Sequence, residues 1–128
     1  MNVKRIGNEY ESKFAEYIQA KGFWCTILPY GKNGQPCDVI AVKNNRAMFI
    51  DVKHCSEDRF AFSNIQPNQL TCFEYNLRCG NTCSGFAIWF EKTQDWRWLN
   101  YATVRSSTKK SVRYDELSKY IGDDSNEV

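Results

Sequence analysis

The stretch QPCDVIAVKNNRAMFIDVK, from Gln35 to Lys53, consists of two short apolar runs separated by a polar turn. The runs are rich in Val, Ile, Phe and Ala, and the turn contains paired asparagines, so the stretch predicts a β-hairpin. Each run carries a carboxylate, because Asp38 opens the first and Asp51 lies near the end of the second. Successive strand side chains alternate between faces, so Asp51 and Lys53 should point the same way, about 6 to 7 Å apart along the strand.

The charged groups of this hairpin need partners, because burying a charge is costly unless a counter-charge or an ion accompanies it. Two converging carboxylates suit a hard divalent cation, since Mg²⁺ takes oxygen ligands and keeps several waters. The ammonium of Lys53 could hold a water molecule and offset charge that develops on a phosphate. The hairpin therefore has the outline of a phosphodiester-cleaving site. The alternative is a surface ion pair between Asp51 and Lys53, which would contribute only about 0 to 1 kcal/mol.

The composition indicates one folded domain and excludes several classes of protein. The chain has 128 residues, 42% of them apolar and 15% aromatic, so we expect a single domain over residues 1–122. That part carries 17 basic and 12 acidic residues, a net charge of +5 that suits a polyanionic partner. We expect residues 123–128 to form an acidic, disordered tail. No apolar run approaches 18 residues and no signal peptide is recognisable, so we expect no membrane association and a cytoplasmic location.

Six cysteines occur, at positions 25, 37, 55, 72, 79 and 83. In a chain without a secretory signal they are most simply free thiols. The alternative is a zinc site in which Cys55 or Cys72 joins Cys79 and Cys83. The Cys-x3-Cys spacing is looser than the paired Cys-x2-Cys of zinc sites, and His54 is the only histidine, so the sequence favours free thiols.

The remaining chain predicts helices on both sides of a mixed sheet. A helix over 7–21 places Tyr10, Phe14, Tyr17 and Ile18 on one apolar stripe. A second helix begins at Pro67 and ends at Gly80. Strands are expected at 23–30, 37–43, 47–53, 85–90 and 96–102, followed by a basic loop over 106–111 and a short helix over 114–121. This order predicts an α/β (α+β) fold in which 85–90 is covered on both faces and 96–102 is an edge strand.

Two polar residues lie at the edges of the apolar helix stripes. Glu11 is about 100° around the first helix from Tyr10, so it could reach solvent or lean over the sheet, and solvent is the simpler expectation. Gln69 lies one helical turn before Phe73 on the second helix, where a structural hydrogen bond is its simpler role.

The pattern Asp38…Asp51-Val52-Lys53, preceded by a helix with Glu11, resembles the restriction-endonuclease-like nucleases of the PD-(D/E)xK superfamily. The opening Gly7-Asn8-Glu9-Tyr10-Glu11 is similar to that of archaeal Holliday junction resolvases, where a glycine precedes the active-site glutamate by four residues, which favours Glu11 over Glu9. The segment Phe60–Ile65, followed by Gln69, resembles the one after the active-site lysine of bacterial RecU resolvases.

Three features depart from these families. One residue separates Pro36 from Asp38, and Asp51 stands where resolvases usually have glutamate. The long stalk of RecU resolvases is reduced to residues 31–35, which bears on junction specificity more than on cleavage.

The resemblance implies a core of order αβββαβ with an extra strand and a C-terminal helix. It also implies that Asp38, Asp51 and the carbonyl of Val52 bind Mg²⁺, or Mn²⁺ as a substitute, and that Glu11 completes the site. Lys53 would position the attacking water, and Gln69 would orient a water or the scissile phosphate. The residues expected to contact the DNA backbone are Lys4, Arg5, Lys32 and Arg59.

The function implied is that of a homodimeric, metal-dependent DNA endonuclease that acts on four-way junctions during DNA recombination or repair, in a bacterial, archaeal or phage-infected cell. The first alternative is a nuclease of the same fold that cuts flaps, nicked duplexes or foreign DNA, in line with the missing stalk. The second is a non-catalytic DNA-binding module, against which the intact set of acids argues.

Overall fold

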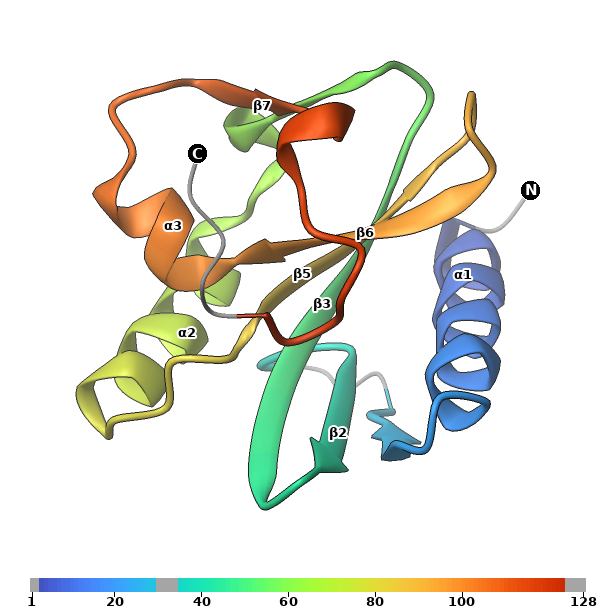
Figure 1. Ribbon diagram of the computed structural model, residues 1–128, viewed down its shortest axis with the longest axis vertical. Coiled ribbons are helices and arrows are strands. Elements are labelled where there is room, and N and C mark those ends of the chain that lie inside the picture. The colour runs from blue at the N-terminus through green and yellow to red at the C-terminus, as the bar shows by residue number, and fades with distance from the viewer. Residues whose placement is uncertain (1–2, 30–34, 124–128) are drawn as a thin grey trace.

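The computed structural model describes residues 3–29 and 35–123, with only the backbone described over 3–8. A five-stranded sheet of order β1-β2-β3-β5-β6 forms its centre (Figure 1). Its strands are β1 (Trp24–Ile27), β2 (Val39–Lys43), β3 (Arg46–Cys55), β5 (Gly85–Phe90) and β6 (Asp95–Asn100). β3 and β5 are parallel and all other neighbours are antiparallel, so the mixed sheet predicted from the sequence is confirmed.

Helices cover both faces of the sheet. On one face α1 (Val3–Gln19) packs Phe14 and Ile18 against Met48 and other apolar residues of the strands. On the other face lie α2 (Pro67–Arg78) and α3 (Tyr101–Ser106), to the left of the sheet in Figure 1. All six residues of β5 are buried, as expected for a central strand covered twice. Within the described residues, no helix has the length and apolar character needed to cross a bilayer.

The hairpin that carries the acidic residues is formed as predicted. β2 and β3 pair from Val39–Ile50 to Lys43–Arg46. Asn44 and Asn45, with φ of 53° and 64°, occupy the two left-handed positions of its tight turn. Asparagine tolerates this backbone conformation, and two left-handed residues match the twist of the flanking strands. The turn therefore fixes the register that places Asp51 near the end of β3.

Two expectations for the second half of the chain were wrong, and two features were missed. The helix expected over 114–121 is a single 3-10 turn, η2 (Tyr114–Glu116), and the strand expected over 96–102 ends at Asn100, where α3 begins. The sequence also missed a two-stranded sheet, in which β4 (Arg59–Ala61) pairs with β7 (Ser111–Arg113), and the 3-10 turn η1 (Phe62–Asn64). Strands of three residues are too short to show a periodic pattern.

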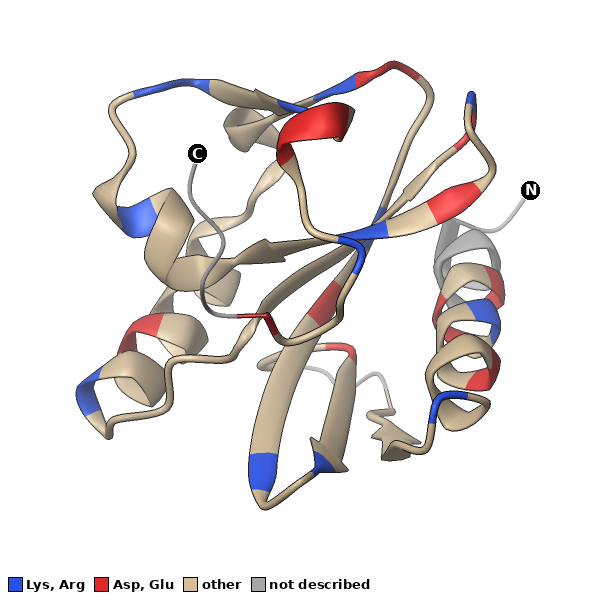
Figure 2. Cartoon of the chain, viewed as in Figure 1, with Lys and Arg blue, Asp and Glu red and all other residues tan. Residues whose placement is uncertain are grey.

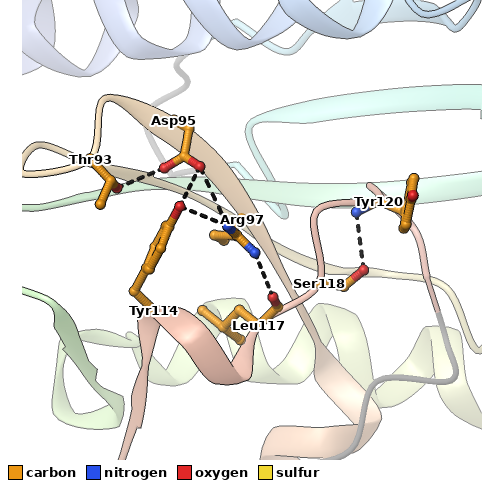
Figure 3. A network of polar contacts seen from close by, with 7 residues as sticks. All are labelled: Thr93, Asp95, Arg97, Tyr114, Leu117, Ser118 and Tyr120. Atoms are coloured by element: carbon orange, nitrogen blue, oxygen red, sulfur yellow. Dashed lines mark hydrogen bonds and ion pairs between the residues drawn. The ribbon is translucent and has the colours of Figure 1, made fainter.

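The segment after η2 stays extended because β6 satisfies its polar groups. The Trp98 amide donates to the Ser118 carbonyl at 2.8 Å, which forms a bridge on the free edge of β6. Side chains strengthen this contact (Figure 3): the Tyr114 hydroxyl donates to Asp95 at 2.6 Å, and Arg97 donates to the Leu117 carbonyl at 3.1 Å. Backbone groups that a helix would have paired internally are thus paired with the sheet.

Two glycines with positive φ offer a matched test of how the C-terminal segment is held. Gly122 (φ +82°) lies against β3, and a Cβ there would come within 2.4 Å of the Met48 sulfur. Gly80 (φ +89°) follows α2, and a Cβ there would meet nothing within 4 Å. We expect Gly80→Ala to lower the free energy of unfolding by about 1 kcal/mol through backbone strain, and Gly122→Ala to lower it further, because only Gly122→Ala must also displace the buried Met48 side chain. Equal losses in urea denaturation would contradict this assignment.

Candidate active site

Asp51 is the most deeply buried carboxylate of the sheet. Its side chain, with a relative exposure of 2%, extends from β3 on the face covered by α2, the face opposite to α1. The Gln69 amide nitrogen donates to Asp51 Oδ1 at 2.9 Å, and Lys53 Nζ lies 3.1 Å from Oδ2. The Lys53 side chain is 18% exposed, so its ammonium lies between the buried acid and solvent. The predicted juxtaposition of Asp51 with Lys53 is therefore confirmed, and Gln69 joins it.

Asp38 lies where β3 runs on past the start of β2. The Asp38 amide donates to the Ile50 carbonyl at 2.9 Å, so the chain is still held against β3 at this residue. Further along β3, no backbone carbonyl of β2 lies opposite the Val52 amide. The amide therefore donates a hydrogen bond to Asp38 Oδ2, at 2.8 Å. The other oxygen, Oδ1, accepts from the Gln35 side chain at 2.6 Å. The backbone pairing thus directs the Asp38 carboxylate toward β3, and so toward Asp51.

Burial and a like charge perturb Asp51. Loss of solvation, and secondly the nearby Asp38 carboxylate, raise the pKa of Asp51 well above its usual value. The Lys53 ammonium opposes this shift and lowers the pKa, but it does not cancel the effect of burial. Two adjacent carboxylates of which one resists ionisation are a common arrangement where a cation or a shared proton is to be bound.

The donors at this point fit a hard divalent cation. The N–H and C=O of one strand residue point toward the same neighbouring strand, so the Val52 carbonyl lies on the side where its amide meets Asp38. Two carboxylates and a carbonyl are oxygen ligands of the kind that Mg²⁺ prefers, with waters completing its shell. Among residues 9–29 and 35–123, no group of three or more His, Cys, Asp or Glu side chains is arranged to hold a metal. The zinc alternative therefore gains no support, and Glu11 is not gathered with Asp38 and Asp51 into a three-carboxylate site.

Gln69 is fixed by the beginning of α2. Pro67 occupies the first turn of the helix, and the Gln66 amide donates to Gln69 Oε1 at 2.9 Å. The other end of the Gln69 side chain is then left to donate to Asp51. One side chain therefore ties the helix start to the buried carboxylate. This is a structural hydrogen bond of the kind that the sequence favoured, and its partner is a candidate site residue.

Glu11 leans over the sheet, contrary to the simpler expectation that it reaches solvent. Its relative exposure is 2%. The neighbouring Tyr10 stacks on His54 of β3 with ring centroids 4.5 Å apart, and its hydroxyl donates to Glu91, which raises the pKa of Tyr10 to about 12. These contacts hold α1 against the far end of β3. The role of Glu11 as a ligand beside Asp38 and Asp51 stays a prediction.

Of the residues expected to contact DNA, only Arg59 has a described side chain. It is exposed on β4 and donates to the Ser111 hydroxyl at 2.9 Å. The side chains of Lys4 and Arg5, and all of Lys32, lie outside the described residues. The sequence missed that Arg59 has basic neighbours, because it did not predict that β4 pairs with β7. These neighbours are Lys109, Lys110 and Arg113, on β7 and in the loop before it. Acids lie beside them, as Figure 2 shows, and Lys109 pairs with Glu116 at 3.2 Å and Arg113 with Asp115 at 3.4 Å.

Comparisons of sequence connect the chain to known proteins. A family model described as archaeal Holliday junction resolvase matches residues 2–122. The chain is 35% identical over 75 residues to a crossover junction endodeoxyribonuclease of Sulfolobus islandicus rod-shaped virus 1, which covers 57% of this chain and 62% of that protein. It is 34% identical over 62 residues to a UPF0102 protein of Fusobacterium nucleatum, which covers 48% and 52%. The chain thus spans less than two thirds of the length of these curated relatives.

The fold is shared with a solved structure. The chain superposes on the Hjc of Archaeoglobus fulgidus, a Holliday junction resolvase from an archaeal hyperthermophile, with a TM-score of 0.67. The match covers 88% of this chain and 94% of that one, at 16% sequence identity. The likeness therefore concerns the architecture, which is the mixed α/β arrangement expected from the sequence.

Proposed function

Since this chain belongs to the archaeal Holliday junction resolvase family, we propose that it is a metal-dependent endodeoxyribonuclease that cuts four-way DNA junctions. Membership of this family confirms the resemblance drawn from Asp38, Asp51 and Lys53. The observation that carries the proposal is the buried Asp51 carboxylate, which contacts Lys53 and Gln69. The Asp38 carboxylate lies beside it, where it accepts a hydrogen bond from the Val52 amide of β3.

The proposed metal ligands are Asp38, Asp51 and the Val52 carbonyl, with Glu11 on the outer side of the site. Mg²⁺ is the natural ion and Mn²⁺ its substitute, because all these donors are oxygen atoms. When bound, the ion would supply Lewis-acid stabilisation of charge on the scissile phosphate and a more acidic water. The raised pKa of Asp51 supports this assignment, because a cation would favour the ionised form that burial disfavours.

Lys53 would act on the water and on the phosphate. Its ammonium is held beside Asp51 and is the more exposed of the two groups, so it can reach a substrate while the acid cannot. It would orient the attacking water and stabilise the charge that develops on the phosphate oxygens. Gln69 would keep the Asp51 carboxylate in the orientation that binding requires.

The proposed enzyme works as a homodimer, because resolving a junction requires cuts in two strands and each chain supplies one site. Arg59 and its basic neighbours around β7 would contact the phosphate backbone, together with Lys4, Arg5 and Lys32. Such contacts should contribute to affinity without selecting a sequence, so each substitution should weaken binding equally for different sequences.

The decisive experiment measures cleavage of a labelled mobile four-way junction beside linear duplex, flap and single-stranded controls, with Mg²⁺ or EDTA. We expect symmetric nicks near the crossover that require the metal and disappear in Asp51→Asn. Metal-dependent cutting of the controls alone would support instead a flap or general nuclease. Junction binding without cleavage in Mg²⁺ or Mn²⁺ would overturn the catalytic assignment.

Gln69 offers a test of positioning with a matched pair of variants. Gln69→Glu keeps the acceptor for the Gln66 amide but loses the donor to Asp51, and Gln69→Ala loses both. We expect cleavage to fall about 10- to 100-fold in both, as is typical when a partner of a metal ligand is lost. Gln69→Ala should also lose about 1 kcal/mol of stability through the helix start, whereas Gln69→Glu should lose stability at neutral pH because its carboxylate lies beside buried Asp51. Full cleavage by Gln69→Glu would show that the contact with Asp51 is unimportant.

A further inference from the structure

A pocket of about 420 Å³ lies on the other face of the sheet from Asp51. Its walls come from the end of α1, the turn between β2 and β3, and the segment 119–122. Met48, which lines it, belongs to the cluster that packs against α1, whereas Asp51 faces α2. Its volume falls in the range of about 300 to 1,000 Å³ that is usual for small-ligand sites. The pocket is thus separate from the proposed active site.

The charge of the pocket is entirely positive among the described residues that line it. Four lining residues are basic, and they are Lys21, Lys43, Arg46 and Lys119. None of the other described lining residues is Asp or Glu. Two acids are neighbours of lining residues along the chain: Glu16, which is exposed on α1, and Asp123, which accepts a hydrogen bond from the Ser118 hydroxyl at 2.9 Å. A concave site with four cations favours an anionic ligand.

Aromatic rings hold two of the ammonium groups at the wall. Lys43 Nζ lies 5.0 Å from the centre of the Phe23 ring and donates to the Lys21 carbonyl at 2.6 Å. Lys21 Nζ lies 4.9 Å from the centre of the Tyr17 ring. A cation that rests on a ring face is oriented before any ligand arrives. These contacts therefore hold the ammonium groups of Lys21 and Lys43 at the pocket before a ligand binds.

Tyr120 supplies an open aromatic surface at the same pocket. Its relative exposure is 74%, although a ring of this size normally gains from burial. The backbone holds it in place, because the Tyr120 amide donates to the Ser118 hydroxyl at 3.0 Å (Figure 3) and Gly122 turns the chain back against Met48. An exposed ring beside fixed cations is suited to stack on the base of a nucleotide whose phosphate the cations bind.

We propose that this pocket binds a nucleotide unit, with the phosphate on Lys21, Lys43 and Lys119 and the base on Tyr120. The nucleotide could belong to a single strand of DNA or be free in solution, and the same chemistry recognises both. The site does not depend on the proposed cleavage, since it shares no residue with the group around Asp51.

The test uses the full chain with Asp51→Asn, so that DNA is not cut, and follows ¹H–¹⁵N chemical shifts during titration. The probes are thymidine 5′-monophosphate, a single-stranded hexathymidylate and inorganic phosphate. We expect shifts to cluster at the pocket. Lys21→Ala/Lys119→Ala should weaken thymidine monophosphate binding at least tenfold, and Tyr120→Ala should weaken it about tenfold. Lys13→Ala/Lys92→Ala removes the same charge from exposed positions outside the pocket and should leave the affinity unchanged.

The probes distinguish the sources of the ligand. Hexathymidylate binding much more tightly than the mononucleotide would assign the pocket to a DNA strand, and equal affinities would assign it to a free nucleotide. Inorganic phosphate binding as tightly as the mononucleotide, with no effect of Tyr120→Ala, would overturn the nucleotide assignment. The assignment would also be overturned if Lys13→Ala/Lys92→Ala weakened thymidine monophosphate binding as much as Lys21→Ala/Lys119→Ala does. Junction cleavage by the wild-type chain is measured separately, so its failure does not bear on this result.

Discussion

Asp51→Asn is expected to abolish junction cleavage, with a loss of at least about 10³-fold, and at the same time to stabilise the metal-free protein near pH 7. The two effects have one cause. The buried carboxylate is placed where its charge is costly without a cation, because Asp38 is close and solvent is excluded. Asparagine keeps the shape and the oxygen that accepts from Gln69 but removes the charge.

The pH dependence of the free energy of unfolding follows from the direction in which folding shifts the pKa of Asp51. In the folded protein the pKa of Asp51 is raised above the value of about 3.9 expected for the unfolded chain. Between these two pKa values the folded state binds more protons than the unfolded state, so the free energy of unfolding falls as the pH rises through this window. A tenfold change in proton affinity corresponds to about 1.4 kcal/mol. Asp51→Asn should remove this contribution and leave a flatter profile from pH 4 to neutrality.

Urea denaturation of the metal-free protein between pH 4 and 8 measures this difference. The matched control is Asp58→Asn, which removes a carboxylate from an exposed position and should leave both cleavage and the stability profile unchanged. Added Mg²⁺ should stabilise the wild-type protein by about 1.4 kcal/mol for each tenfold excess over its dissociation constant, and Asp51→Asn much less. If the Asp51→Asn protein were less stable than wild type at pH 7, the buried charge of Asp51 would not be destabilising in the metal-free protein.

The hairpin and its site could be predicted because local sequence determines them. The asparagine turn fixes the register of β2 and β3, and strand alternation then places Asp51 and Lys53 on one face. Pro67 marks the beginning of α2, so Gln69 could be placed on its first turn. Which acid would be buried was beyond local patterns, because Glu11 lies at the edge of its apolar stripe and only the packing of α1 decides its exposure.

The rest of the fold depends on contacts between distant segments. β4 and β7 are three-residue strands about fifty positions apart, and neither has a pattern that identifies its partner. The extended path after η2 depends on the free edge of β6, which offers Trp98 as a backbone partner to Ser118. The lysines of the nucleotide pocket likewise come from three separate segments of the chain, so no local sequence motif predicts the pocket.

Lys53→Met is the second variant for which we expect a large effect, with cleavage lowered about 10² to 10⁴-fold. Methionine keeps a flexible apolar stem of similar length but removes the ammonium that lies 3.1 Å from Asp51. Because that ammonium lowers the pKa of Asp51, its loss should raise this pKa further and leave Asp51 neutral over a wider pH range. Lys53→Arg keeps the charge and should retain more cleavage than Lys53→Met, measured as single-turnover rates on the four-way junction.

The double variant Asp51→Asn/Lys53→Met separates a structural ion pair from a catalytic one. Lys53→Met alone leaves a buried carboxylate without its cation, so it should lose stability at pH 7 and regain it as the pH falls and Asp51 is protonated. Adding Asp51→Asn removes that acid and should restore most of the stability at pH 7. Cleavage should stay absent in the double variant. If restored stability brought cleavage back, the two residues would serve only to hold β3 in place, and the reaction would have to be assigned to other groups.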